Sequence, residues 1–408
     1  MAATPWKTSS DIIESVKRKI MMPIHQITFT EEDILKFANE EMATSQIPSI
    51  LDVHEEYLVR TDEVSLEADK VRYPIPDRAI GLRLRDLFYQ DSSGNLFEMT
   101  RVSVGDIDLY QSSNESLTPK HKYYLENNDV VLLSDVQQTD AEGTLVFKYF
   151  IRPNQLVLNN RAAIINGFTE SITLVNASIV AGDTVTIEDI VFTAVASSPS
   201  TDEFEIGGTA IITATNLALA INTEGSFLAT NGTPATDTVT ITFDMRDFDV
   251  EVSNSTGFEI SETTGIQFDS IPDNIENGSI IDFLQTKPGH KIYSFDVEIP
   301  DNAISTDIIE FDDDDIPEDL VVGDYICLAH ECIIPQIPPD LHNVLCERTA
   351  ASMLESQGDQ AGLQAKALKI QEMEKNQSNL IDNRVEGAPQ KIVGRHSLLK
   401  LTSRRKGW

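Results

Sequence analysis

The sequence predicts an α+β protein, with helices near both ends of the chain and β-rich segments between them. Two observations predict this class. Apolar residues recur at helical spacing before residue 50 and after residue 337, whereas the chain between them alternates apolar with polar residues or is rich in Thr, Val and Ile. The 408 residues exceed what one ordinary core accommodates, so we expect several domains.

Residues 1–50 are predicted to form two helices. Residues 11–20 place Ile and Val side chains on one face, and Ser and Thr residues just upstream can cap that helix. The second helix starts after Thr30, which has the spacing of a capping box with Asp33. We expect Pro48 to end it, because proline interrupts a helix.

Residues 51–168 are predicted to form an antiparallel β domain. Residues 80–85 alternate Ile and Leu with Gly and Arg, and the turn-forming cluster at 91–95 separates this strand from the next, which predicts a hairpin. A second hairpin is expected over residues 123–133. Residues 145–151 are a further strongly β-prone run.

Residues 169–279 are predicted to form a separate, inserted domain that is β-rich and β-sandwich-like. Between residues 170 and 279 there are 18 acids and one base, Arg246. Residues 181–187 and 190–195 read as two strands joined by a short turn, and residues 214–221 read as one short helix. Similar β character resumes afterwards, so residues 280–337 are expected to return to the first β domain.

Residues 338–387 are predicted to form a C-terminal αα-hairpin. Pro338 and Pro339 open its first helix, and Gly358 separates that helix from the second. A connection this short makes the two helices antiparallel neighbours. Residues 388–408 are then expected to form an extended basic tail.

The tail is positively charged, unlike the rest of the chain, since residues 391–408 contain six bases and no acid. A nucleic-acid arm, a solvated terminus and a docking strand are three readings of such a segment. Apolar residues alternate with the charges, which favours a strand that inserts into an acidic groove of a partner. The bases are Lys391, Arg395, Lys400, Arg404, Arg405 and Lys406, and Trp408 follows them as an apolar anchor.

The overall charge restricts the classes of partner. The formal net charge is −35, from 66 acids and 31 bases, so sequence-specific nucleic-acid binding and docking on an anionic membrane are both disfavoured. No apolar run is long enough to span a bilayer, and the first ten residues lack the apolar region of a secretory signal. Three cysteines suit reduced thiols in a cytosol better than a disulfide scaffold.

No catalytic or metal-binding constellation stands out. The sequence has no phosphate-binding glycine loop, zinc-protease or serine-hydrolase motif, which argues against an enzyme. The sequence spacing between Cys327, His330 and Cys332 is too short for a usual zinc site. The four consecutive aspartates at residues 312–315 lack the alternating oxygen ligands of a calcium-binding loop. We therefore expect no cofactor and no metal, with weak cation binding at residues 312–315 left open. The remaining carboxylate sets are expected to be exposed faces of acidic strands: Asp247, Asp249, Glu251, Glu203 and Glu205.

The order of these parts resembles the head–tail adaptor proteins of tailed bacteriophages, such as the tail accessory factor of short-tailed phages and the first neck-ring protein of crAss-like phages. The resemblance covers roughly residues 8–168 and 288–400. The segments that carry it are YYLE at 123–126, FKYFIRP at 147–153, PPDLH at 338–342, ERTAA at 347–351 and NLIDNRVEG at 379–387.

The resemblance implies a non-enzymatic ring in the virion neck, usually of twelve copies, assembled in the host cytoplasm. The ring would dock under the portal protein, continue the DNA channel without binding DNA specifically, and contact further neck or tail proteins. It also implies that the basic tail docks along the portal. Arg384 and Glu386, at the end of the hairpin, are expected to contact another subunit or the portal.

The insert has a resemblance of its own, to a β module that recurs as a decoration of phage virion proteins. The similar segments are AGDTVTI at 181–187, FTAV at 192–195, FEIGG at 204–208 and ATNLALAIN at 214–222. This suggests an alternative function, a fibre or decoration protein whose insert contacts a partner or receptor. A hydrolase acting through the acidic strands is a third hypothesis, without an assembled site to support it.

Overall fold

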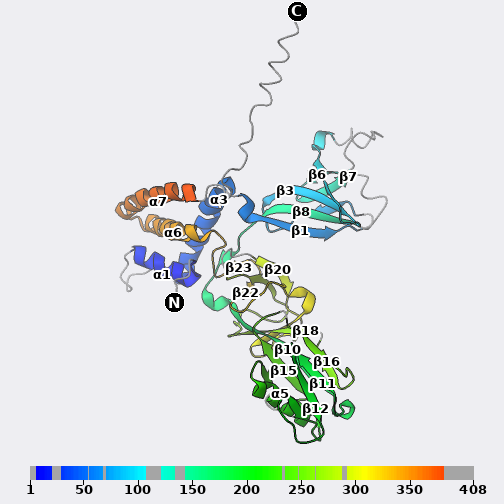
Figure 1. The fold of residues 1–408 in the computed structure, drawn as a ribbon. Coiled ribbons are helices and arrows are strands. Elements are labelled where there is room, and N and C mark those ends of the chain that lie inside the picture. Colours follow the sequence, from blue (N-terminus) through cyan, green and yellow to red (C-terminus); the bar gives the residue numbers. More distant parts are fainter. Residues whose placement is uncertain are drawn as a thin grey trace, which may run out of the picture. The chain divides into compact units, whose positions relative to one another are not determined.

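A computed structural model describes residues 6–20, 29–53, 55–67, 70–106, 121–133, 143–231, 235–246, 248–261, 263–286 and 292–380. The α+β class is confirmed (Figure 1). The chain forms two compact units, one from residues 1–42 and 153–367 and the other from residues 43–152 and 368–408. The predicted N-terminal helical range, 1–50, is thus divided between the units at residue 42.

The two N-terminal helices of the first unit form for the reasons that the sequence indicates. Helix α1 (Ser9–Ile20) buries Ile12, Ile13 and Val16 on one face. Helix α2 (Glu31–Glu41) begins with a capping box, in which the Thr30 side chain accepts from the Asp33 backbone and the Asp33 side chain accepts from the Thr30 backbone. The predicted capping box is therefore confirmed.

The prediction that Pro48 ends the second helix is wrong. Helix α2 continues through a π-helical turn (Met42–Gln46) into α3 (Ile47–Val53), and Pro48 is the second residue of α3. The π-helical turn just before Pro48 already interrupts the regular i→i−4 hydrogen bonding that a proline would break, so the chain stays helical through this residue.

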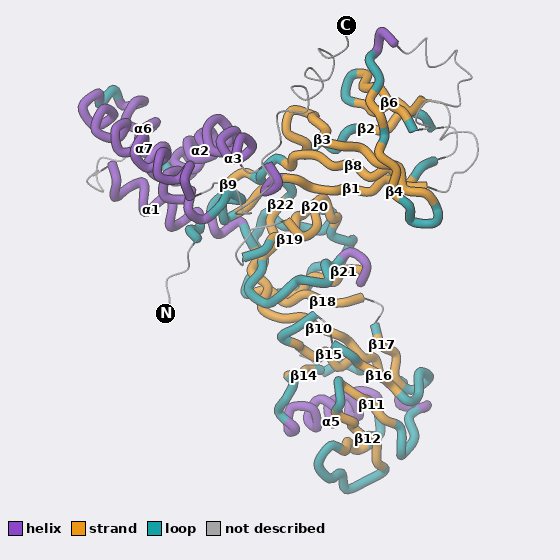
Figure 2. Tube along the Cα trace, turned by 45° about the horizontal axis from the view of Figure 1, so that its top comes forward, coloured by secondary structure: helices purple, strands orange, loops and turns teal. Residues whose placement is uncertain are grey.

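The second unit is built on two four-stranded sheets (Figure 2). The first, in the order β1-β8-β3-β4, consists of β1 (Val59–Ser65), β8 (Gly143–Ile151), β3 (Ala79–Asp91) and β4 (Leu96–Glu98). The second, in the order β2-β7-β6-β5, consists of β2 (Arg72–Pro74), β7 (Asp129–Leu133), β6 (Lys122–Glu126) and β5 (Thr100–Arg101). Both predicted hairpins, β3–β4 and β6–β7, are present, whereas β5 pairs with β6 in parallel.

Side chains from both sheets form the core of the second unit. Tyr73, Phe147 and Tyr149 are among its fully buried members. Strand β3 keeps the predicted alternation of burial, but its pairing with β8 shifts between Ala79 and Asp86. Gly81 has a φ of 58°, a value that a glycine adopts without strain, so it accommodates this irregularity.

The first unit contains a nine-stranded sheet around one long strand, β10 (Ala163–Leu174). Strand β10 pairs with β15, β17, β18 and β22 along its length, so it joins segments that are distant in the sequence. The other strands are β14 (Leu228–Thr230), β15 (Thr238–Phe243), β17 (Phe258–Ile260), β18 (Thr263–Phe268), β19 (Ile280–Leu284), β20 (Ile292–Glu298), β21 (Ile308–Asp312) and β22 (Tyr325–Leu328). A short parallel pair joins β9 (Gln155–Leu156) to β23 (Glu331–Cys332).

A four-stranded sheet and one helix complete the β-rich part of this unit. The sheet has the order β13-β12-β11-β16, and α5 (Ala210–Glu224) contacts strands of both sheets. Its strands are β11 (Thr184–Ile187), β12 (Ile190–Val195), β13 (Glu203–Glu205) and β16 (Val250–Val252). One core cluster extends from Ala163 to Ile326, so the predicted ranges 169–279 and 280–337 share a core instead of forming separate bodies.

The predicted C-terminal hairpin is present as α6 (His342–Gln357) and α7 (Gln360–Leu380). Gly358 ends α6 with a φ of 77°, the left-handed conformation typical of a helix C-cap. The apolar residues along α6 are buried, including Leu345 and Met353. Those of α7 are less covered, since Leu363, Ile370 and Met373 are half-buried.

Candidate functional site

The predicted portal-docking residues lie outside the described residues. This holds for Lys391, Arg395, Lys400, Arg404, Arg405, Lys406 and Trp408, and also for Arg384 and Glu386. Helix α7 is described as far as Leu380, so the structure shows how the hairpin that precedes the tail is held.

A buried ion-pair cluster fixes this hairpin to the N-terminal helices. Glu347 of α6 is fully buried; its Oε1 lies 2.5 Å from Nζ of Lys19 on α1, and its Oε2 lies 2.7 Å from Nζ of Lys366 on α7. One carboxylate therefore bridges three helices. The two lysines compensate the hydration that the Glu347 carboxylate loses on burial.

Further polar contacts extend this attachment. Glu41 at the end of α2 lies 3.5 Å from the Arg348 guanidinium and accepts the Ser352 hydroxyl, both on α6. His342, at the start of α6, accepts the backbone N–H of Lys7 through Nδ1 and faces the Ile337 carbonyl oxygen through Nε2. These two partners fix the imidazole as the Nε2–H tautomer.

The cysteines behave as buried structural thiols. Cys327 and Cys332 are fully buried, and burial raises the pKa of both thiols above the ordinary range. The Cys332 thiol donates to the Asn154 carbonyl oxygen, while the His330 backbone donates to Asp282. Within the part of the chain that the structure describes, no three His, Cys, Asp or Glu side chains are grouped so that they could hold a metal ion.

The acidic run at 312–315 includes a short 3-10 turn (Asp313–Asp315). Asp313 is paired with Arg246 at 3.0 Å and accepts the Thr264 hydroxyl at 3.2 Å. The neighbouring Glu170 on β10 is buried, and its Oε1 has no hydrogen-bond partner. Burial, with a further contribution from the Asp313 charge, raises the pKa of Glu170 to about 7.

Two buried aspartates that the sequence analysis did not identify tie this unit together. Asp282 is fully buried and accepts hydrogen bonds from the Asn154 side chain and from the backbones of Asp296 and His330. Asp324 likewise accepts from the Thr286 backbone and the Tyr293 hydroxyl. Each carboxylate replaces water with protein donors, which indicates a structural role. Neither lies in a recognisable motif.

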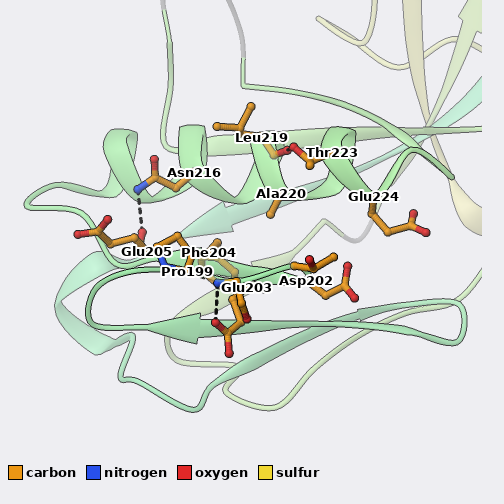
Figure 3. Close-up of a pocket in the computed structure, with 12 residues that line it drawn as sticks. Pro199, Asp202, Glu203, Phe204, Glu205, Asn216, Leu219, Ala220, Thr223 and Glu224 are labelled. Atoms are coloured by element: carbon orange, nitrogen blue, oxygen red, sulfur yellow. Dashed lines mark hydrogen bonds between the residues drawn. The ribbon is translucent and has the colours of Figure 1, made fainter.

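The described residues also form an acidic groove between α5 and the segment that contains β13 (Figure 3). It has a volume of about 210 Å³. Phe204, Leu219 and Ala220 provide apolar lining, and Asn216 of α5 donates to the Glu205 carbonyl oxygen at 2.8 Å. The carboxylates that line the groove are Asp202, Glu203, Glu205 and Glu224.

Two of the groove carboxylates, Glu203 and Glu205, were predicted only as the exposed face of a strand. Glu203 and Glu205 alternate with the buried Phe204, as predicted for one face of a strand. Both also line the groove, beside the exposed Leu219 of α5. The sequence did not show that these strand residues meet Asp202 and the end of α5. Of the other predicted carboxylates, Glu251 lies in β16, Asp249 directly precedes that strand, and Asp247 lies outside the described residues.

No helix among the described residues is long and apolar enough to cross a membrane. No protein-family model matches the sequence, and no curated protein matches it.

Proposed function

We propose that the protein is a structural, non-enzymatic component of a phage neck, an adaptor ring that docks on the portal protein and continues the DNA channel. The observation that carries the proposal is the anchored hairpin before the basic tail. Glu347 joins α6 to α1 and to α7, and the six bases begin at residue 391, soon after α7. A docking strand can position the whole protein only if the helices that precede it are firmly attached to the rest of the chain.

The chemistry of the chain supports the same function. A protein with a net charge of −35 repels DNA phosphates, so an acidic channel wall lets DNA pass without adhering. The tail has the opposite sign and contains apolar residues, which suits a segment that becomes ordered on an acidic partner. The proposed state is a ring of about twelve copies, as the resemblance implies, in the virion neck.

The test is native mass spectrometry of the purified chain, alone and with the portal protein from the same genome. The proposal predicts a complex that needs the portal and contains one chain per portal subunit. Deletion of residues 391–408 should leave a folded protein that no longer binds the portal. Full-strength binding by the truncated chain would exclude docking through the tail. A discrete trimer that ignores the portal would support a fibre or decoration protein instead.

A further inference from the structure

A second groove of the first unit, the aromatic groove, has the size of a ligand-binding site. Its volume is about 860 Å³, within the range usual for small-molecule sites. It lies at the end of β15, and the residues that line it also come from β10, β18, the turn after β11 and the segment from the end of α5 to β14. None of them lines the acidic groove, and all belong to one unit.

Three phenylalanines form the apolar part of the aromatic groove. The rings of Phe243 and Phe248 are stacked, with centroids 4.0 Å apart and planes 6° apart, and the centroids of Phe227 and Phe243 are 5.6 Å apart. Phe243 is buried, whereas Phe227 and Phe248 are half-buried and therefore present part of their surface to the groove. The stacking holds the Phe248 ring in a fixed orientation. Such a ring can bind the C–H groups of a ligand against its π face.

A β-bulge places a polar side chain beside these rings. Strand β10 pairs with β18 at Ile165 with Phe268 and at Gly167 with Gln267, so Asn166 is an extra residue without a partner across the ladder. Its side chain is exposed and lines the groove, as does that of Gln267. Among the described residues, neither side-chain amide has a hydrogen-bond partner. Both amides are therefore available to a ligand.

The polar groups of the groove define the chemistry of that ligand. Two carboxylates, Glu188 and Asp244, line the groove, and no lysine or arginine is among its lining residues, so an anionic ligand is repelled. A purely cationic ligand would satisfy the carboxylates but would leave the amide N–H groups of Asn166 and Gln267 without acceptors. A ligand that fits must carry groups that both donate and accept hydrogen bonds, next to an apolar face.

We infer that the aromatic groove binds a neutral saccharide. The C–H face of a sugar ring can stack on Phe248, while its hydroxyl groups donate to the carboxylates and both donate to and accept from the amides. Leu228 and Met245, which are 59% and 67% exposed, extend the apolar surface of the groove for a further sugar unit. The inference goes beyond the proposed adaptor function and does not rest on it, because all of these residues lie within one unit of one chain.

The test is binding of the purified full-length protein to an array of immobilised oligosaccharides. Neutral oligomers of glucose, galactose, mannose and N-acetylglucosamine are compared with sulfated and sialylated oligosaccharides. We expect binding to at least one neutral series, about tenfold above binding to the acidic ones, because the two carboxylates repel anions. Equal binding to acidic oligosaccharides would overturn the inference. So would a lack of binding to every neutral series, and the exposed Leu228 and Met245 would then indicate a protein partner.

Variants then locate the binding site, with the affinity for the bound oligosaccharide measured by isothermal titration calorimetry. Phe248→Leu keeps an apolar side chain but removes the aromatic face, so the affinity should fall about fivefold. Phe97→Leu is the matched control, because Phe97 also stacks on an aromatic ring, that of Tyr89, and is 41% exposed in the other unit.

Asn166→Ala tests the groove without disturbing its packing. The Asn166 side chain is exposed and has no hydrogen-bond partner among the described residues, so its loss should leave the melting temperature unchanged. The affinity should fall about threefold or more, as expected for a lost hydrogen bond to the ligand. Unchanged affinity in both Phe248→Leu and Asn166→Ala would overturn the inference. Portal binding is measured separately, so either proposal can fail alone.

Discussion

Glu347 joins the C-terminal hairpin to α1 through a buried ion-pair cluster. Its side chain is fully buried, whereas those of Lys19 and Lys366 are 21% and 16% exposed. Glu347→Ala would leave two poorly hydrated ammonium groups without their shared partner. Removing one member of a buried ion pair typically destabilises by about 3 kcal/mol or more. We expect a loss of about 3 kcal/mol in the free energy of unfolding, measured by urea denaturation.

The matched control for this prediction is an exposed ion pair in the same helical region. Glu14 and Arg18 of α1 are paired, with side chains 62% and 75% exposed. Exposed pairs contribute little, so Glu14→Ala should change the stability by less than about 0.5 kcal/mol. Equal effects of the two substitutions would show that Glu347 is not the structural centre of the hairpin.

Glu170 makes stability depend on pH. Its pKa is raised to about 7 from an ordinary value of 4.5, chiefly by burial. The folded chain therefore retains a proton that the unfolded chain releases, and Glu170 lowers stability as pH rises from about 4.5 to 7. Glu170→Gln should stabilise the protein by about 2 kcal/mol at pH 8 and have little effect at pH 4.5. Urea denaturation at both pH values measures this difference.

The exposed Glu259 on β17 offers the control for Glu170. Glu259→Gln should leave stability unchanged within about 0.5 kcal/mol at both pH values, as is usual for exposed positions. A Glu170→Gln effect of equal size at pH 4.5 and pH 8 would show that packing, and not ionisation, is responsible.

For single residues, contacts with sequence neighbours could be predicted, whereas contacts with residues distant in the sequence could not. Thr30 and Asp33 are three residues apart, so their capping box follows from the sequence alone. Glu347 lies 328 residues from Lys19, and nothing near it in the sequence indicates burial between two lysines. The groove follows the same rule: alternation places Glu203 and Glu205 on one face, but only the fold brings α5 beside them.

Among the elements, the contact between β13 and α5 depends on Gly207. A Cβ at Gly207 would lie 2.4 Å from Cγ2 of Ile212, too close without a shift of the helix, and the Gly207 backbone also donates to the Thr213 hydroxyl. Gly207→Ala should therefore destabilise by about 2 kcal/mol, the scale of overpacking. A Cβ at Gly208 would meet nothing within 4 Å, so Gly208→Ala is the control. Thermal unfolding of both variants tests this, and equal melting temperatures would contradict it.

The type of most elements was predictable, but their continuity was not. Both hairpins of the second unit form around the predicted turns, because turn residues there separate β-prone runs. Pro48 did not stop its helix, since the π-helical turn before it already interrupts the regular hydrogen bonding. Strand β10 crosses the boundary predicted at residue 168. Its pairing partners span residues 238–328, and such distant pairing leaves no local signal.

For the whole molecule, composition indicated the sign of the charge and its uneven distribution. Residues 170–279 hold 18 acids and one base, whereas residues 391–408 hold six bases and no acid. The acidic, β-rich composition of residues 170–279, with similar β character resuming after it, predicted that this stretch is a separate insert. It instead shares one core with residues 280–337, because apolar side chains from both ranges meet around β10.

The net charge of −35 also determines how association of the copies should respond to salt. Like charges repel across any interface between copies, and the screening length shortens to about 10 Å at 0.1 M salt. We therefore expect self-association to strengthen between 20 and 300 mM NaCl, measured by sedimentation velocity. If the mass of the assembly obtained from sedimentation velocity falls as the salt concentration rises, attraction between opposite charges holds the copies together. Magnesium chloride at equal ionic strength is the control, since screening alone predicts the same mass in both salts.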